Sequence, residues 1–283
     1  MPYKKIALYA SYQTGENLPG YVRFALQKLA ATDFHVVLLT NRRELSSETR
    51  AFLEQSGVEL FLTENHGFDF GMWRRYLQSQ AAGESLASLE RLLLINDSTV
   101  YYRNIFPQIF EQAEKSSADV VSLTRNTEIF PHLQSYFLYI KQPALGSFYT
   151  HLFETPEQTK FYDVVHNLEI GLSRHFAENE VTMESIYSPE GTVIFAYPKL
   201  IMDGAGFVKR KLLQRRFTLK EKVHFARWKA LDALNCDYGR LIKNAGVDSD
   251  FNLDWLPRPT ESAARHVVDA VWEKLVSLLL SHA

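Results

Sequence analysis

The sequence has little of what marks several common classes of protein. Its 283 residues include a single cysteine, Cys236, so an internal disulfide is excluded, and no Cys/His spacing typical of structural zinc occurs. No stretch approaches the roughly 18 uninterrupted apolar residues of a membrane-spanning helix, and the N-terminal apolar run is too short for a signal peptide. We therefore expect a protein of the cytoplasm.

Neither sign of charge dominates the chain. Lysine and arginine together number 31 and aspartate and glutamate 33, which gives a net charge of −2. No overall field attracts nucleic acid, so no nucleic-acid partner is expected. Glycine-rich nucleotide motifs are also missing: the sequence contains no G-x-G-x-x-G and no G-x-x-x-x-G-K-[ST]. A nicotinamide-dependent oxidoreductase therefore loses its main support.

Apolar runs alternate with helical patterns in the first 125 residues, as in a parallel sheet covered by helices. Beyond them we expect an aromatic strand over residues 133–141 and an amphipathic helix over residues 161–176. Residues 1–207 are expected to form the main domain and residues 208–283 a helical C-terminal extension packed on it. The first five predicted strands are residues 6–12, 34–40, 58–63, 91–95 and 119–124.

Polar residues follow four of the expected strands. In open α/β sheets, ligands bind beyond the carboxyl ends of the strands, so these residues are the first candidates for a site. They are Ser11 and Tyr12, then Thr40 and Asn41, then residues 64–69, and finally Asn96, Asp97 and Ser98.

The acid at the end of the fourth strand is Asp97. A carboxylate in such a position can hold a divalent cation or a ribose hydroxyl. Because Asn96 and Ser98 beside it are neutral, Mg²⁺ or Mn²⁺ at Asp97 would be held weakly, and direct recognition of a ligand is the alternative. The three residues are also typical of a turn that caps the backbone.

A second polar segment is ENHGFDFGMWRRYL at residues 64–77. Gly67 and Gly71 allow a close approach of the backbone, and Asp69 and Arg74 place charge beside an expected ligand. A simple strand-to-helix turn with Asp69 as its cap would have the same pattern.

Five blocks occur in this order along the sequence: ENHGFDFGMWRRYL, RLLLINDSTVYY, HLQSYFLYIK, HNLEIGLSRHF and GFVKRKLL. Together they resemble the rhamnan synthesis protein F family of bacterial polysaccharide glycosyltransferases, over about residues 4–215. A more distant similarity is to inverting transferases of the GT-A fold, in which an N-x-G loop precedes an acidic motif. Asn65-x-Gly67 and Asn96-Asp97-Ser98 stand in those places.

The resemblance implies a GT-A-like, Rossmann-like α/β fold with a mixed sheet. It also implies transfer of a deoxysugar or a hexose, including galactofuranose, from a nucleotide-diphosphate donor to a lipid-linked or polysaccharide acceptor, as in O-antigen, lipopolysaccharide or capsule synthesis. The donor is then expected at Tyr9, Ser11, Tyr12, Thr40, Asn41, Asn65, Gly67, Asp69, Asn96, Asp97, Ser98, Lys209 and Arg210.

Glu169 is the candidate catalytic base. It lies at the border of the apolar face of the expected helix over residues 161–176, so partial burial is expected to raise its pKa, as suits a group that removes a proton from an acceptor hydroxyl. A salt-bridged glutamate at the helix edge is the alternative. The acceptor itself is expected at His132, Gln134, Ser135 and Tyr136.

Residues 208–222 form the strongest charge run, with seven basic residues and one acidic. Lys209 and Arg210 can neutralise the leaving diphosphate, or residues 209–222 can contact an anionic lipid surface such as the inner membrane. A solvated helix face would also carry such charge. The sequence thus favours an inverting glycosyltransferase, and the alternative is a non-catalytic module that binds or assembles glycans.

Overall fold

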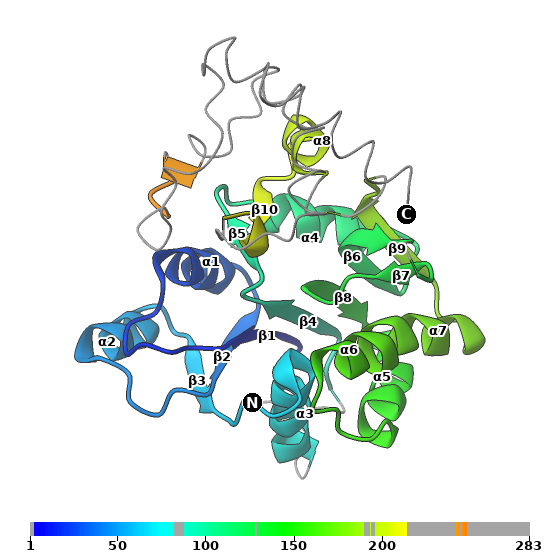
Figure 1. The fold of residues 1–283 in the computed structure, drawn as a ribbon, viewed down its shortest axis with the longest axis horizontal. Coiled ribbons are helices and arrows are strands. Elements are labelled where there is room, and N and C mark those ends of the chain that lie inside the picture. The colour runs from blue at the N-terminus through cyan, green and yellow to red at the C-terminus, as the bar shows by residue number, and fades with distance from the viewer. Residues whose placement is uncertain are drawn as a thin grey trace, which may run out of the picture.

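A mixed sheet of eight strands forms the centre of the structure (Figure 1). The computed structural model describes residues 3–81, 88–127, 129–189, 193, 196–213, 242–243 and 245–247. The strand order is β3-β2-β1-β4-β8-β6-β7, and β9 pairs with β6. The strands are β1 (Lys5–Ser11), β2 (His35–Thr40), β3 (Glu59–Leu62), β4 (Arg91–Asn96), β6 (Val120–Asn126), β7 (His132–Leu133), β8 (Phe137–Lys141) and β9 (Met183–Tyr187).

Strands β1 to β4 run parallel to one another, whereas β8 runs antiparallel to both β4 and β6. The register aligns Ser11 with Thr40 and Ala10 with Asn96. The polar residues that follow the parallel strands are therefore brought to one edge of the sheet. This convergence, predicted from the sequence, is confirmed.

Helices cover both faces of the sheet, because side chains along a buried strand alternate between the two faces. In β1, Ala7 and Tyr9 belong to one hydrophobic cluster, and Ile6, Leu8 and Ala10 belong to the other. The mixed α/β architecture predicted from the sequence is thus confirmed. The first face is covered by α1 (Gly20–Ala30), α2 (Ser47–Gln55), α4 (Phe106–Lys115) and α8 (Tyr197–Met202), and the second by α3 (Phe68–Ala81), α5 (Gln142–Glu154) and α7 (Gly171–Glu178) (Figure 1).

The single aromatic strand predicted over residues 133–141 is wrong in one respect: it is broken between β7 and β8. The backbone N–H of Gln134 still donates to the carbonyl of Thr124, at 3.1 Å. The next N–H, that of Ser135, donates instead to the carboxylate of Glu169, at 2.8 Å. A side chain thus replaces the neighbouring strand as the hydrogen-bond acceptor, and the pairing of the strand is interrupted at Ser135.

The amphipathic helix predicted over residues 161–176 is present, but its middle part is not an ordinary α-helix. After α6 (Phe161–Asp163) the chain forms a π-helix over Val164–Ile170 and returns to α-helical geometry in α7. A π-helix has a wider turn than an α-helix and is frequently found at functional sites. Positions judged by a 3.6-residue period are therefore displaced around this axis, including that of Glu169.

A small second sheet was not predicted. It pairs β5 (Thr99–Tyr101), which follows β4 directly, with β10 (Phe207–Lys209) in antiparallel fashion. Both Phe207 and Val208, on either side of the expected domain boundary, belong to the hydrophobic cluster of the first face. Most of the expected helical extension lies outside the described residues.

Candidate functional site

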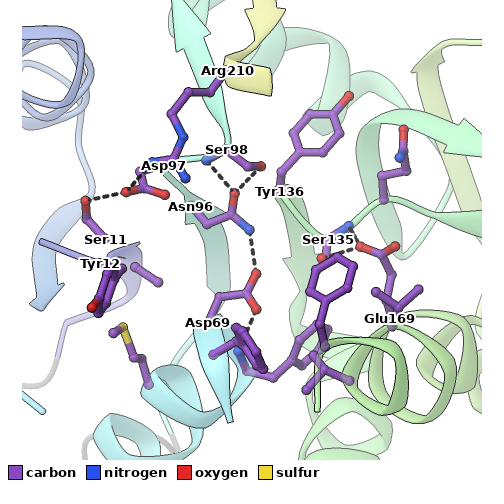
Figure 2. Close-up of a pocket in the computed structure, with 18 of the residues that line it drawn as sticks. Ser11, Tyr12, Asp69, Asn96, Asp97, Ser98, Ser135, Tyr136, Glu169 and Arg210 are labelled. Atoms are coloured by element: carbon purple, nitrogen blue, oxygen red, sulfur yellow. Dashed lines mark hydrogen bonds and ion pairs between the residues drawn. The ribbon is translucent and has the colours of Figure 1, made fainter. Parts of the chain in front are cut away.

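A cavity of about 610 Å³ opens at the carboxyl edge of the parallel strands. Its polar side chains come from four places: the ends of β1 and β4 with the start of α3 and the loop before it, the break between β7 and β8, the π-helix, and β10 with the residues after it. Figure 2 shows how they face one another. The predicted site residues that line the cavity are Ser11, Tyr12, Asn65, Asp69, Asn96, Asp97, Ser98, Gln134, Ser135, Tyr136, Glu169, Lys209 and Arg210.

Asp97 is held in an ion pair. Its Oδ2 lies 2.9 Å from Nη1 of Arg210 and accepts a hydrogen bond from Oγ of Ser11, also at 2.9 Å. Arg210 also donates to the hydroxyl of Tyr21, at 2.9 Å. Burial raises the pKa of Asp97, although Arg210 and Ser11 both favour the charged form. This wall therefore presents a fixed guanidinium beside a carboxylate.

Lys209 lies next to this pair. Its Nζ donates to Oγ of Ser98, at 3.0 Å, and stands 3.7 Å from the centre of the Tyr136 ring. Burial lowers the pKa of Lys209 to about 8, against the opposing effect of Glu169, Asp69 and Asp97. The ammonium group is therefore charged at pH 7 and loses its charge in a mildly alkaline solution.

Glu169 stands on the opposite side of the cavity. Its Oε2 accepts hydrogen bonds from the backbone N–H and the hydroxyl of Ser135, and its Oε1 lies 3.4 Å from Nε2 of His132. Burial acts to raise the pKa of Glu169, but the hydrogen bonds from His132 and Ser135 outweigh it, so the pKa lies below the ordinary value. The raised pKa predicted from the sequence is wrong, because these partners could not be foreseen from helical spacing.

Asp69 is the carboxylate in the middle of the site, between the Asp97 group and Glu169 (Figure 2). Its Oδ2 accepts from Nδ2 of Asn96 at 2.5 Å, and its Oδ1 accepts from the backbone N–H of Phe70 at 3.1 Å. Burial raises the pKa of Asp69 to about 6, although the hydrogen bond from Asn96 lowers it. Asp69 thus changes its charge closer to neutral pH than an ordinary aspartate.

Five predicted site residues do not line the cavity. Tyr9 is fully buried in the hydrophobic cluster of the first face, and Thr40 is buried at the end of β2. The side chain of Asn41 is bonded to the backbone N–H and carbonyl of Gln13, and so holds the loop after β1. The other two are Gly67, in a turn with φ of +77°, and His132, behind Glu169.

Apolar residues that the sequence reasoning missed form the remaining wall. Phe68 and Phe161 pack edge to face with ring centres 6.0 Å apart, and Val164 and Val165 lie beside them. Phe161 is 58% exposed. In the sequence, Phe161, Val164 and Val165 have the spacing of an ordinary buried helix face. Only the exposure of Phe161 in the structure distinguishes this wall from the protein core.

A divalent cation such as Mg²⁺ needs several oxygen ligands that are free to coordinate it. Within the described residues, no group of three or more His, Cys, Asp or Glu side chains is suited to a metal ion. The Oδ2 of Asp97 is already occupied by Arg210, and Oδ1 of Asn96 accepts from the N–H and hydroxyl of Ser98. These groups do not fit a resident cation, and Mg²⁺ or Mn²⁺ at Asp97 stays a prediction.

The sequence profile of the rhamnan synthesis protein F family matches residues 36–242, which is more than half of the chain. The chain therefore belongs to this family, and the resemblance found in the five sequence blocks is confirmed. The mixed sheet with helices on both faces agrees with the α/β fold expected from the sequence, and the GT-A-like class stays a prediction.

The sequence identity to an individual relative is low. The uncharacterized protein y4gN of Sinorhizobium fredii (strain NBRC 101917 / NGR234) is 26% identical over 171 residues, which cover 58% of this chain and 44% of that protein. The chain thus spans less than half the length of this relative.

Two solved structures show a low structural likeness. One is a glycosyltransferase involved in the glycosylation of the major capsid of PBCV-1, at 14% identity and a TM-score of 0.36, covering 72% of this chain and 93% of that one. The other is a cytidylyltransferase from Leptospira borgpetersenii, at 14% identity and a TM-score of 0.37, covering 66% and 77%. The assignment to the family rests on the sequence profile.

Proposed function

We propose that this protein is an inverting glycosyltransferase of polysaccharide synthesis. It would move a rhamnose-like deoxysugar, or galactofuranose or another hexose, from a nucleotide-diphosphate donor to a lipid-linked or polysaccharide acceptor of the O-antigen, lipopolysaccharide or capsule type. The observation that carries the proposal is a single cavity with cations and carboxylates in different places. The cations Lys209 and Arg210 lie on one side. The carboxylate of Asp69 lies in the middle, and that of Glu169 lies on the far side.

The cationic side suits the diphosphate of a donor. A guanidinium and an ammonium group offer N–H donors to phosphate oxygens, and such charge-assisted hydrogen bonds are stronger than neutral ones. Charge develops on the leaving diphosphate during transfer, and cations fixed in advance stabilise it without reorganisation. Arg210 is already oriented by Asp97 and Tyr21, so little freedom is lost when a donor binds.

Transfer with inversion is a single displacement. An acceptor hydroxyl attacks the anomeric carbon, the bond from that carbon to the diphosphate oxygen breaks, and its electron pair leaves with the nucleoside diphosphate. A carboxylate must take the proton of the hydroxyl. The hypothesis from the sequence assigns this role to Glu169, which is consistent with its position beside Ser135 and Tyr136, the expected acceptor residues.

Calorimetric titration with UDP, dTDP and GDP tests the donor site. We expect one of them to bind, and Asp97→Asn to weaken binding at least tenfold because Arg210 is no longer held. A matched control is Asp33→Asn, which removes an exposed carboxylate paired with Lys5 at the opposite edge of the sheet. If no diphosphate binds, with or without Mg²⁺ or Mn²⁺, the proposal fails.

The second candidate is a module that binds or assembles glycans without catalysis. The single acid of the Asn96-Asp97-Ser98 motif favours it. The purified protein is to be incubated with a panel of nucleotide-sugars, including dTDP-rhamnose, UDP-galactofuranose and UDP-glucose, and hydrolysis or transfer is measured. Donor binding without any turnover over the whole panel would support the second candidate.

We also propose a cellular location for the protein. Within the described residues, no helix combines the length and the apolar character needed to cross a membrane. We keep the prediction of a cytoplasmic protein that contacts the inner membrane through residues 209–222. Most of that segment lies outside the described residues, and a vesicle-flotation assay with anionic lipid would test it.

A further inference from the structure

The turn before α3 holds Asp69 in place by an unusual backbone. Gly67 and Phe68 are both left-handed, with φ of +77° and +56°. An aromatic residue rarely adopts this conformation, and strain of this kind is concentrated at functional sites. A side chain at position 71 would not fit against this turn, since a Cβ on Gly71 would lie 2.0 Å from the carbonyl oxygen of His66. Asp69 follows directly, in the first turn of α3.

The hydrogen bonds around Asp69 give it one orientation. The Oδ1 of Asn96 accepts from the N–H and the hydroxyl of Ser98, at 3.1 and 2.6 Å. The amide nitrogen of Asn96 must therefore point toward Asp69, to which it donates. Unlike Asp97, Asp69 has no ion-pair partner within hydrogen-bond distance among the described residues.

The charged groups that face Asp69 come from two other elements. Glu169, on the π-helix, raises its pKa, and Lys209, on β10, interacts with it across the cavity. Burial is the larger cause, and the resulting pKa of about 6 lies close to working pH, where a general base is most effective. Glu169 differs, because the hydrogen bonds from Ser135 and His132 hold its pKa low.

We propose that Asp69, rather than Glu169, is the proton acceptor of the transfer reaction. Its carboxylate takes the proton of the acceptor hydroxyl as that oxygen bonds to the anomeric carbon and the diphosphate leaves with the electron pair. The proton passes to water after the product leaves. Glu169 is then a positioning residue, which holds the Ser135 backbone in the opening between β7 and β8. This proposal rests on the proposed function.

The test compares the pH dependence of kcat/KM for the parent, Asp69→Asn and Glu169→Gln. The parent is expected to lose activity on acidification with an apparent pKa near 6. Asp69→Asn should lose turnover by 100-fold or more and lose this pH dependence, but keep its dissociation constant for the nucleoside diphosphate within about threefold. Glu169→Gln should keep the acid limb near pH 6 at a reduced rate.

Two results would overturn the assignment. One is an Asp69→Asn variant that turns over within tenfold of the parent. The other is an acid limb of the parent well below pH 5 that disappears in Glu169→Gln. If neither the parent nor any variant transfers sugar, the proposed function fails. In that case ¹³C-carboxyl NMR still tests the titration of Asp69 directly. A signal that titrates near pH 6 and is absent from Asp69→Asn supports the unusual acid, and an ordinary aspartate titration refutes it.

Discussion

The two sides of the cavity are built on different principles. On the donor side, the buried carboxylate of Asp97 pairs with the partly exposed Arg210, which comes from a distant part of the sequence, and Lys209 lies beside them. On the side where the acceptor is proposed to bind, the aromatic rings of Phe68 and Phe161 line the same cavity as Glu169. A buried charge without its partner costs more than a lost contact of an exposed aromatic ring. The donor side should therefore be much more sensitive to substitution.

The largest effect is expected for Arg210→Met. It leaves Asp97 buried without its cation, so we expect a loss of about 2 kcal/mol in the free energy of unfolding, discounted because Arg210 is partly exposed. Donor affinity should fall by two orders of magnitude. Urea unfolding and calorimetry measure the two effects. The double variant with Asp97→Asn should recover stability but not donor affinity, and a double variant as unstable as Arg210→Met would contradict the pairing.

The charge of Asp69 gives the next effect. Its pKa of about 6 in the folded protein lies above the ordinary value of 3.8, so the folded state holds the proton more tightly than the unfolded state. Ionisation therefore costs stability as pH rises from about 4 to 6. Asp69→Asn should stabilise the protein by about 2 kcal/mol at pH 7 and by almost nothing at pH 3.5. Equal gains at both pH values would exclude this explanation.

The donor side should also respond to alkali through Lys209. Its pKa of about 8 means that the free protein loses this cation as pH rises above 8. We expect the affinity for a nucleoside diphosphate to fall roughly tenfold per pH unit above 8. Lys209→Arg should bind with little change up to pH 9.5, because a guanidinium stays charged. Identical pH profiles for the two proteins would place the titration elsewhere.

The acceptor side should give a smaller effect. Phe161→Ala removes an exposed ring from the cavity wall, and we expect the KM for the acceptor to rise about tenfold while donor affinity stays unchanged. The matched control is Tyr3→Ala, because Tyr3 is also an exposed aromatic residue but stacks on His35 at the opposite edge of the sheet. Equal effects of the two substitutions would mean that the ring serves stability rather than the acceptor.

The smallest effect is expected from chelation. Arg210 and Lys209 already stand where a cation would neutralise the diphosphate. We expect excess EDTA to change the dissociation constant of the nucleoside diphosphate by less than threefold. A loss of binding that added Mn²⁺ restores would show that Asp97 holds a metal and that the donor side is not completed by protein cations alone.

Much of the donor side was predictable from local sequence. An apolar run that stops at Asn96, Asp97 and Ser98 identifies a strand end, and parallel strands bring such ends to one edge. The break in the strand over residues 133–141 was not predictable in this way. It depends on the carboxylate of Glu169, which takes the N–H of Ser135 from a distant part of the chain.

By itself, the amino-acid sequence determined the alternation of strands and helices in the first 125 residues and the polar residues at the strand ends, because these follow from short-range periodicity. It also indicated the family, because five sequence blocks resemble it. Only the tertiary structure decided which carboxylates are paired and which one has a pKa close to neutral pH. Asp97 meets Arg210, and Glu169 meets Ser135 and His132, whereas Asp69 is left with Asn96 alone among these side chains. The pKa of each acid depends on burial and neighbours, and both arise from contacts between distant segments.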